Sequence, residues 1–135
     1  KRDLGLMAKG GVEAGVPVFI GSAGGSGSNP QVDWTLDILR EICEEQSITP
    51  KVVVLRSEIS KEKLKSKIEN DKITPLGPIA PLTLDDADNS HRVVAMMGIE
   101  PFQEALETGA QVVIAGRSSD AAIYASVPLR QTKKL

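Results

Sequence analysis

The chain is poor in the side chains from which disulfides and metal centres are built. It has one cysteine, Cys43, and one histidine, His91, among 135 residues. A single thiol cannot form an internal disulfide, and one thiol with one imidazole is too few ligands for a structural zinc site. Any site for a hard metal ion would therefore have to use carboxylates.

Aromatic rings and excess positive charge are also scarce. Aromatic residues make up 3% of the chain, and the formal net charge is -2 at pH 7. Proteins that bind single-stranded nucleic acid stack bases on aromatic rings and neutralise phosphates with a basic surface. The sequence meets neither requirement, so we do not expect nucleic acid as a partner.

Long apolar runs are absent too. No run approaches the ~20 residues that a helix needs to cross a bilayer, and the first residues do not form a signal-type apolar segment. We therefore expect a cytoplasmic protein without membrane contacts. The length suits a single α/β domain over residues 1–135. Because the chain starts without methionine inside helix-like sequence, we expect it to be an internal part of a longer protein.

Short apolar runs, in contrast, alternate regularly with helix-like segments. We expect strands at residues 18–20, 52–55, 93–97 and 111–116, with helices before, between and after them. This alternation predicts an α/β fold, a three-layer sandwich with a mainly parallel sheet of about four strands and helices on both faces. The arrangement would be Rossmann-like.

Proline, glycine and capping residues mark the expected ends of the helices. Asn29 fits an N-cap and Pro30 the first position of a helix that runs to about Gln46. Gly15 fits the left-handed residue that closes the opening helix, and Pro128 is expected to end the last one.

A long connection is expected over residues 74–91, where prolines and aspartates prevent any long regular element. A short helix near residues 83–87 is compatible with this composition. Connections of this length are often lids or binding loops. His91 stands at its end, and a lone histidine in a polar loop is more often a surface residue than a catalytic one.

The glycine-rich stretch at residues 21–29 joins the first expected strand to a helix. Such loops present backbone N–H groups at a helix N-terminus, where the helix dipole favours an anion, so a phosphate or carboxylate cradle is predicted. The spacing matches neither the P-loop nor the Gly-x-Gly-x-x-Gly dinucleotide motif. A flexible connection without a ligand is the alternative. The expected ligand contacts are Gly24, Gly25, Ser26, Gly27, Ser28 and Asn29.

A second polar loop, Arg-Ser-Ser-Asp, follows the last expected strand. Arg117 can grip a carboxylate or phosphate, and Ser118 or Ser119 can cap the next helix and contact the same anion. Asp120, with Glu100 as its companion, is the candidate catalytic base or hard-metal ligand. The structural alternative is a capped helix with a local Arg117–Asp120 pair. In a parallel sheet, four loops would gather at the carboxyl edge, namely residues 21–29, 56–58, 98–100 and 116–120.

Two stretches together resemble the acyclic terpene utilisation (AtuA-like) family. The first is Gly-Ser-Ala-Gly-Gly-Ser-Gly at 21–27 with Val-Asp-Trp-Thr at 32–35, and the second is Met-Gly-Ile-Glu-Pro-Phe at 97–102 with the segment 112–120. The resemblance spans about residues 5–128 and implies an internal fragment, since members of the family are longer. It implies a link to the breakdown of acyclic terpenoids such as citronellol or geraniol, through CoA thioesters. It assigns a role to no residue.

These observations favour an enzyme, or the ligand-binding domain of one, that binds a carboxylate- or phosphate-bearing small molecule at the carboxyl edge. An acyl-CoA is one candidate ligand, while the reaction class and any cofactor stay open. One alternative is an NAD(P)- or nucleotide-binding Rossmann-type module, with Arg56, Ser57 and Glu58 on the ribose. The other is a non-catalytic scaffold or assembly segment. Besides a small molecule, the expected partners are the rest of the full-length chain and a second copy in a homo-oligomer.

Overall fold

The computed structural model describes residues 1–132. The elements follow one another as α1 (Arg2–Ala14), β1 (Val18–Ile20), α2 (Asn29–Gln46), β2 (Val52–Leu55), α3 (Lys61–Glu69), α4 (Leu84–Asn89), α5 (Glu100–Glu107), β3 (Val112–Ala115) and α6 (Asp120–Thr132). The predicted α/β class is confirmed. Within residues 1–132, no helix combines the length and the apolar character needed to cross a membrane.

The sheet is parallel and has β3 at its centre. The strand order is β1-β3-β2, and Val112 of β3 is in register with Val18 on one side and Val52 on the other. Every residue of β3 is buried. A continuous apolar, β-branched run is typical of such a strand, because both of its faces are covered.

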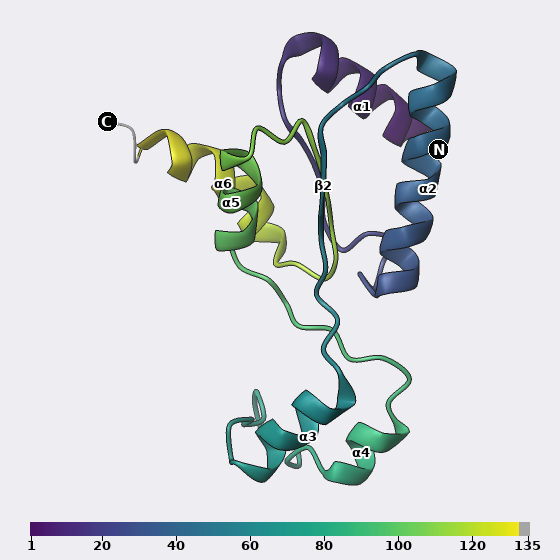
Figure 1. The fold of residues 1–135 in the computed structure, drawn as a ribbon. Helices are drawn as coiled ribbons and strands as arrows, with labels where there is room; N and C mark the ends of the chain where they lie inside the picture. Colours follow the sequence, from purple (N-terminus) through teal and green to yellow (C-terminus); the bar gives the residue numbers. More distant parts are fainter. Residues whose placement is uncertain (133–135) are drawn as a thin grey trace.

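The side chains of β3 alternate between two core clusters. Val112 and Ile114 pack with residues of α1 and α2, whereas Val113 and Ala115 pack with residues of α5 and α6. Figure 1 shows these helix pairs on opposite sides of the strands. The neighbouring strands β1 and β3 are therefore followed by helices on opposite faces, which makes a topological switch point. Open α/β sheets bind ligands at such points, outside the carboxyl ends of the strands.

Within residues 1–132 the sheet has three strands rather than the predicted four, because residues 93–97 do not form a strand. Val94 makes one antiparallel bridge with Glu58, and Met97 makes one parallel bridge with Ser118. The segment thus divides its backbone pairing between two neighbours. Its apolar composition correctly indicates extended chain, but pairing partners are set by long-range packing, which local composition does not encode.

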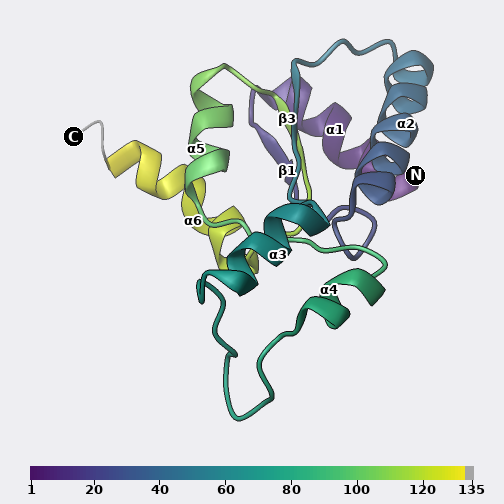
Figure 2. The same ribbon diagram turned by 60° about the horizontal axis from the view of Figure 1, so that its bottom comes forward.

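Residues 60–92 form a small lobe outside the sheet (Figures 1 and 2). Its helices α3 and α4 pack on each other, and the buried side chains are Leu64 and Ala87. The predicted short helix near 83–87 is confirmed as α4. The lobe joins the sheet through a neck of two antiparallel limbs, residues 57–59 and 93–95. In the neck, the N–H of Ile59 donates to the Val93 carbonyl at 2.9 Å.

Two predicted helix boundaries are wrong. The N-cap of α2 is Ser28, so Asn29 is already helical and Pro30 follows it. Pro128 lies inside α6 and does not end it. An exposed proline near the end of a helix removes one intrahelical hydrogen bond, and the helix continues to Thr132 without it. Gly15 closes α1 as predicted, with φ at 66°.

Candidate functional site

Three loops leave the carboxyl ends of the strands and contact one another. They are the glycine loop (residues 21–28) after β1, residues 56–58 after β2 and residues 116–119 after β3. Ser57, which is 5% exposed, joins all three loops. Its hydroxyl donates to the Gly27 carbonyl at 3.3 Å and accepts the N–H of Arg117 at 2.6 Å. The predicted meeting of these loops at one edge is confirmed.

Gly27 allows the glycine loop to lie directly on the loop after β3. Its φ is +73°, and a Cβ at this position would overlap the backbone of Gly116 and Arg117. A left-handed conformation and this lack of space both require glycine. The position of the glycine loop at the edge therefore depends on Gly27.

The backbone N–H groups of the glycine loop are largely used inside the protein. Hydrogen bonds to protein acceptors are donated by the amides of Ser22, Ala23, Gly25, Ser26, Gly27 and Ser28. The hydroxyl of Ser26 also donates to the side-chain carbonyl of Gln31, at 2.5 Å. This edge therefore offers an anion mainly side-chain donors, and few backbone ones.

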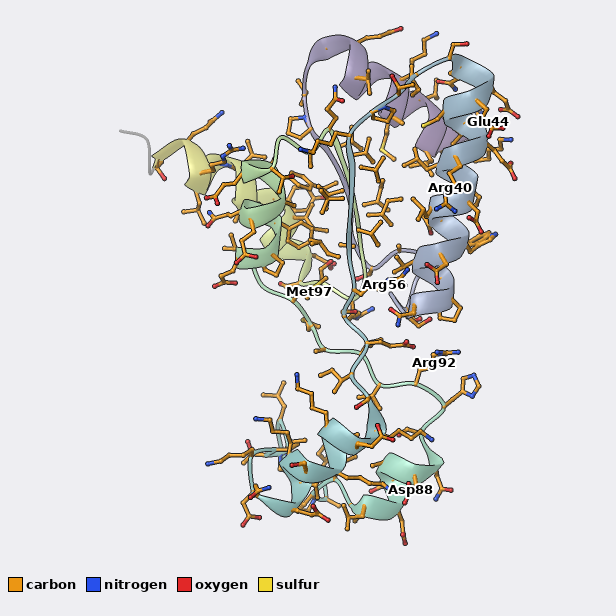
Figure 3. The ribbon with its side chains drawn as sticks, in the orientation of Figure 1. Arg40, Glu44, Arg56, Asp88, Arg92 and Met97 are labelled. Atoms are coloured by element: carbon orange, nitrogen blue, oxygen red, sulfur yellow. The ribbon has the colours of Figure 1, made fainter. Side chains whose placement is uncertain are left out.

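A pocket of about 620 Å³ lies beside the glycine loop. Its lining consists of Ser26, Ser28, Pro30, Gln31, His91 and Arg92. These residues come from the glycine loop, the first turn of α2 and the end of the lobe. Figure 3 shows Arg92 between the amino-terminal end of α2 and the lobe. The guanidinium of Arg92 pairs with Glu58 at 3.0 Å, and that carboxylate is only 15% exposed.

Sequence reasoning did not place His91 and Arg92 at this site. They lie directly before residues 93–95, the second limb of the neck. This limb brings them beside the glycine loop, from which they are separated by about 60 residues of sequence. Nothing in the local sequence signals that return. A long connection carrying a cation and the only histidine is the one hint that the sequence contains.

The polar residues after β3 lie against the glycine loop. Arg117 donates from Nη1 to the Gly25 carbonyl at 3.4 Å. Ser118 is 2% exposed, and its N–H donates to the Ser22 hydroxyl at 3.3 Å. Its own Oγ is buried without a hydrogen-bond partner in the described part of the chain. The N–H of Ser119 donates to the Met97 carbonyl at 3.0 Å.

The residues predicted as ligand contacts in the glycine loop differ in exposure. Gly24, Gly25 and Ser26 are exposed, while Gly27 and Ser28 are buried. The next residue, Asn29, is half-buried, and within residues 1–132 its Oδ1 is buried without a hydrogen-bond partner. Of the residues predicted in this loop, the serines line the pocket.

The carboxylates predicted as catalytic, Asp120 and Glu100, open α6 and α5 and are exposed. The helix dipole favours a negative charge in a first turn. Among the described residues, no ion pair joins Asp120 to Arg117 or to any other cation. Residues 1–132 also contain no group of three His, Cys, Asp or Glu side chains placed to hold a metal ion.

Protein contacts engage the three residues considered for ribose binding after β2. Arg56 donates to Asp33 at 2.5 Å, which lowers the pKa of that carboxyl. Ser57 links the three loops, and Glu58 holds Arg92. These side chains organise the edge of the sheet and the neck.

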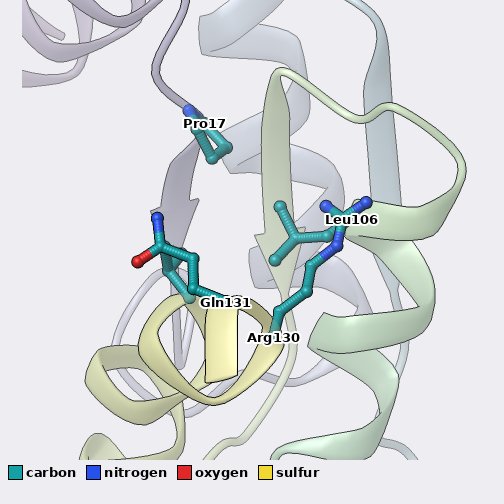
Figure 4. A pocket seen from close by; sticks show the side chains of 5 residues that line it. Pro17, Leu106, Arg130 and Gln131 are labelled. Atoms are coloured by element: carbon teal, nitrogen blue, oxygen red, sulfur yellow. The ribbon is translucent and has the colours of Figure 1, made fainter. Parts of the chain in front are cut away.

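A smaller pocket lies near the amino end of β1, away from the glycine loop (Figure 4). Its volume is about 230 Å³, and its lining consists of Pro17, Leu106, Val127, Arg130 and Gln131. None of the residues predicted from the sequence as site residues lines this pocket.

The fold defines an α/β protein whose parallel strands carry their polar loops to one shared edge. The chain belongs to the acyclic terpene utilisation family: the model of the acyclic terpene utilisation family protein AtuA matches residues 16–129. The resemblance inferred from the glycine loop and the segment 112–120 is thereby confirmed. No curated protein and no solved structure matches the chain.

Proposed function

We propose that this protein binds a small molecule bearing a carboxylate or phosphate in the pocket beside the glycine loop, as an enzyme or as the ligand-binding part of one. The observation that supports the proposal is the composition of the pocket. Hydroxyl, amide, imidazole and guanidinium groups converge there from three segments, and the described lining contains no carboxylate.

Several of these groups keep donors that protein contacts do not use. Ser28 is buried but lines the pocket, and among residues 1–132 its side chain makes no capping bond, so its hydroxyl can donate to a ligand there. The side-chain carbonyl of Gln31 accepts from Ser26, which leaves the amide NH₂ to donate. Arg92 uses Nη1 for Glu58, and a guanidinium has further N–H groups for a carboxylate or phosphate. Arg117 supports the same site by holding the glycine loop at Gly25.

In the enzyme form of the proposal, Asp120 and Glu100 are the proton-transfer groups. Both are exposed carboxylates at the starts of α6 and α5 near the carboxyl edge. Neither belongs to the described lining of the pocket, so the ligand would have to extend along that edge to meet them. Acyl-CoA thioesters belong to the proposed ligand class because they carry phosphate groups. The family name, with its reference to terpene utilisation, is consistent with small-molecule breakdown.

Calorimetric titration with inorganic phosphate and with acetate tests the proposal. Replacing Arg92 by Gln should weaken binding about tenfold or more, because a hydrogen bond to a charged group contributes about 1.5–3 kcal/mol. Arg40→Gln is the matched control, since Arg40 pairs with Asp37 on the exposed face of α2. Equal losses in both variants, or no binding of either anion, would contradict the proposal. Melting curves should show that both variants fold.

A further inference from the structure

Trp34 is the only tryptophan of the chain, and it is 61% exposed. It belongs to neither core cluster. The ring–ring contact found among the described residues joins Phe19 and Phe102 and does not involve Trp34. An indole is the largest apolar side chain and normally stabilises a core or an interface. The fold described here does not use this one in its core.

Its place on α2 sets Trp34 next to the pocket. Pro30 and Gln31 line the pocket, and Trp34 follows them by four and three residues, the spacing at which helical side chains share a face. Along the helix axis this separation is about one turn, or ~5.4 Å. Long helical side chains lean toward the N-terminus, so we expect the indole to lie over the turn that carries Pro30 and Gln31.

The donors in the pocket and the exposed ring suit two different parts of one ligand. Ser28, Gln31, His91 and Arg92 can surround a phosphate, whose oxygens accept hydrogen bonds from several directions. One turn away, an exposed indole face can stack on a planar ring, as aromatic side chains do with nucleobases. A sugar is long enough to connect the two.

We propose that the ligand is a phosphate ester carrying a planar ring, of the nucleoside monophosphate type, and that Trp34 stacks on this ring. This inference rests on the proposed anion site, because the same pocket holds the phosphate. This mode of binding differs from that of Rossmann dinucleotide-binding proteins, in which residues after the second strand contact the ribose. Here α2 supplies the ring contact, and the residues after β2 bond to other parts of the protein.

Titration with AMP and with ribose 5-phosphate separates the contribution of the ring to the binding affinity from that of the phosphate. Trp34 is the sole tryptophan, so its fluorescence reports directly on stacking. AMP should quench this emission and bind about fivefold or more tightly than ribose 5-phosphate, the difference expected from stacking on one ring. Trp34→Leu keeps an apolar side chain and should abolish the preference, with ribose 5-phosphate affinity unchanged by calorimetry. Trp34→Tyr should retain most of the preference for AMP, because the tyrosine ring can also stack.

The outcomes distinguish this inference from the function on which it rests. Equal affinities for AMP and ribose 5-phosphate, or a preference that survives Trp34→Leu, would overturn stacking while leaving the anion site in place. Failure of both ligands to bind would overturn the anion site and the inference together. A preference that disappears in Trp34→Leu and persists in Trp34→Tyr would support both.

Discussion

Gly27 holds two loops closer together than a side chain would allow. Replacement by Ala should lower the free energy of unfolding by about 2–4 kcal/mol, because the new Cβ meets the backbone of Arg117 in a left-handed conformation. Urea denaturation measures the change. Gly10→Ala is the control, since Gly10 is helical and has open space around it, so that variant should gain about 0.5–1 kcal/mol. Similar values for the two variants would show that Gly27 does not fix the edge.

At the level of residues, the sequence predicts the glycine loop well and its partners poorly. A run of glycines and serines after an apolar strand indicates the loop. Glycine permits the left-handed backbone of tight turns, and serine hydroxyls can bond to the nearby backbone. It does not indicate that Ser57 joins three loops, or that Gln31 accepts from Ser26. Those contacts depend on how separate loops meet in space, so they follow from the fold and not from spacing along the chain.

Helix α4 begins with hydrogen bonds between Thr83 and Asp86, and those that the Asp86 carboxylate accepts depend on pH. The Asp86 carboxylate accepts from the Thr83 hydroxyl at 2.6 Å and from the Thr83 N–H at 2.9 Å, and these bonds lower the pKa of Asp86. The pKa is lower in the folded state than in the unfolded chain. The pair therefore stabilises α4 above the unfolded value of about 3.9, and the contribution disappears as pH falls through the folded value.

Hydrogen exchange measured from pH 6 down to pH 2 should show α4 losing protection at a higher pH than β3. Asp86→Asn should remove this pH step, because an amide does not titrate in this range. Asp85→Asn should retain it, since the capping residue is Asp86. A step that survives Asp86→Asn would assign the acid sensitivity of α4 to another group.

At the level of elements, capping residues and apolar runs indicate where helices and extended segments lie, but not their boundaries to the residue or their pairing partners. Ser60 caps α3, and its hydroxyl accepts the Lys63 N–H, as a serine directly before a helix commonly does. The apolar run at residues 93–97 wrongly predicts a fourth strand. Such a run indicates burial and extended backbone, but it does not indicate which neighbouring segment it pairs with. The N-cap of α2 falls one residue early, at Ser28, since Ser and Asn are similarly good caps.

On the scale of the whole molecule, the lobe and the sheet have separate buried groups. Leu64 and Ala87 belong to neither cluster around β3, and the lobe meets the sheet through the neck. Leu64→Ala should therefore reduce the opening free energy of α3 and α4 by about 2–4 kcal/mol, and β3 should be unaffected. Hydrogen exchange of the two groups of amides measures this.

Ile114→Ala is the companion variant, because Ile114 lies in the centre of the sheet and packs with α1 and α2. It should reduce the protection of β3 by a similar amount. If Leu64→Ala weakens β3 as much as α3, the lobe and the sheet unfold together and the separation proposed here is wrong.

The neck also has a consequence for how this fold can diversify. Since the Ile59–Val93 hydrogen bond holds its limbs side by side, the chain leaves the α/β unit and returns to it at one point. A hairpin turn, or a lobe of another sequence, can occupy that point without disturbing the strand order. His91 and Arg92 would be exchanged with the lobe, whereas Ser26 and Ser28 would stay. Under the proposed function, replacing this one lobe would change the ligand selectivity of the site and leave the glycine loop in place.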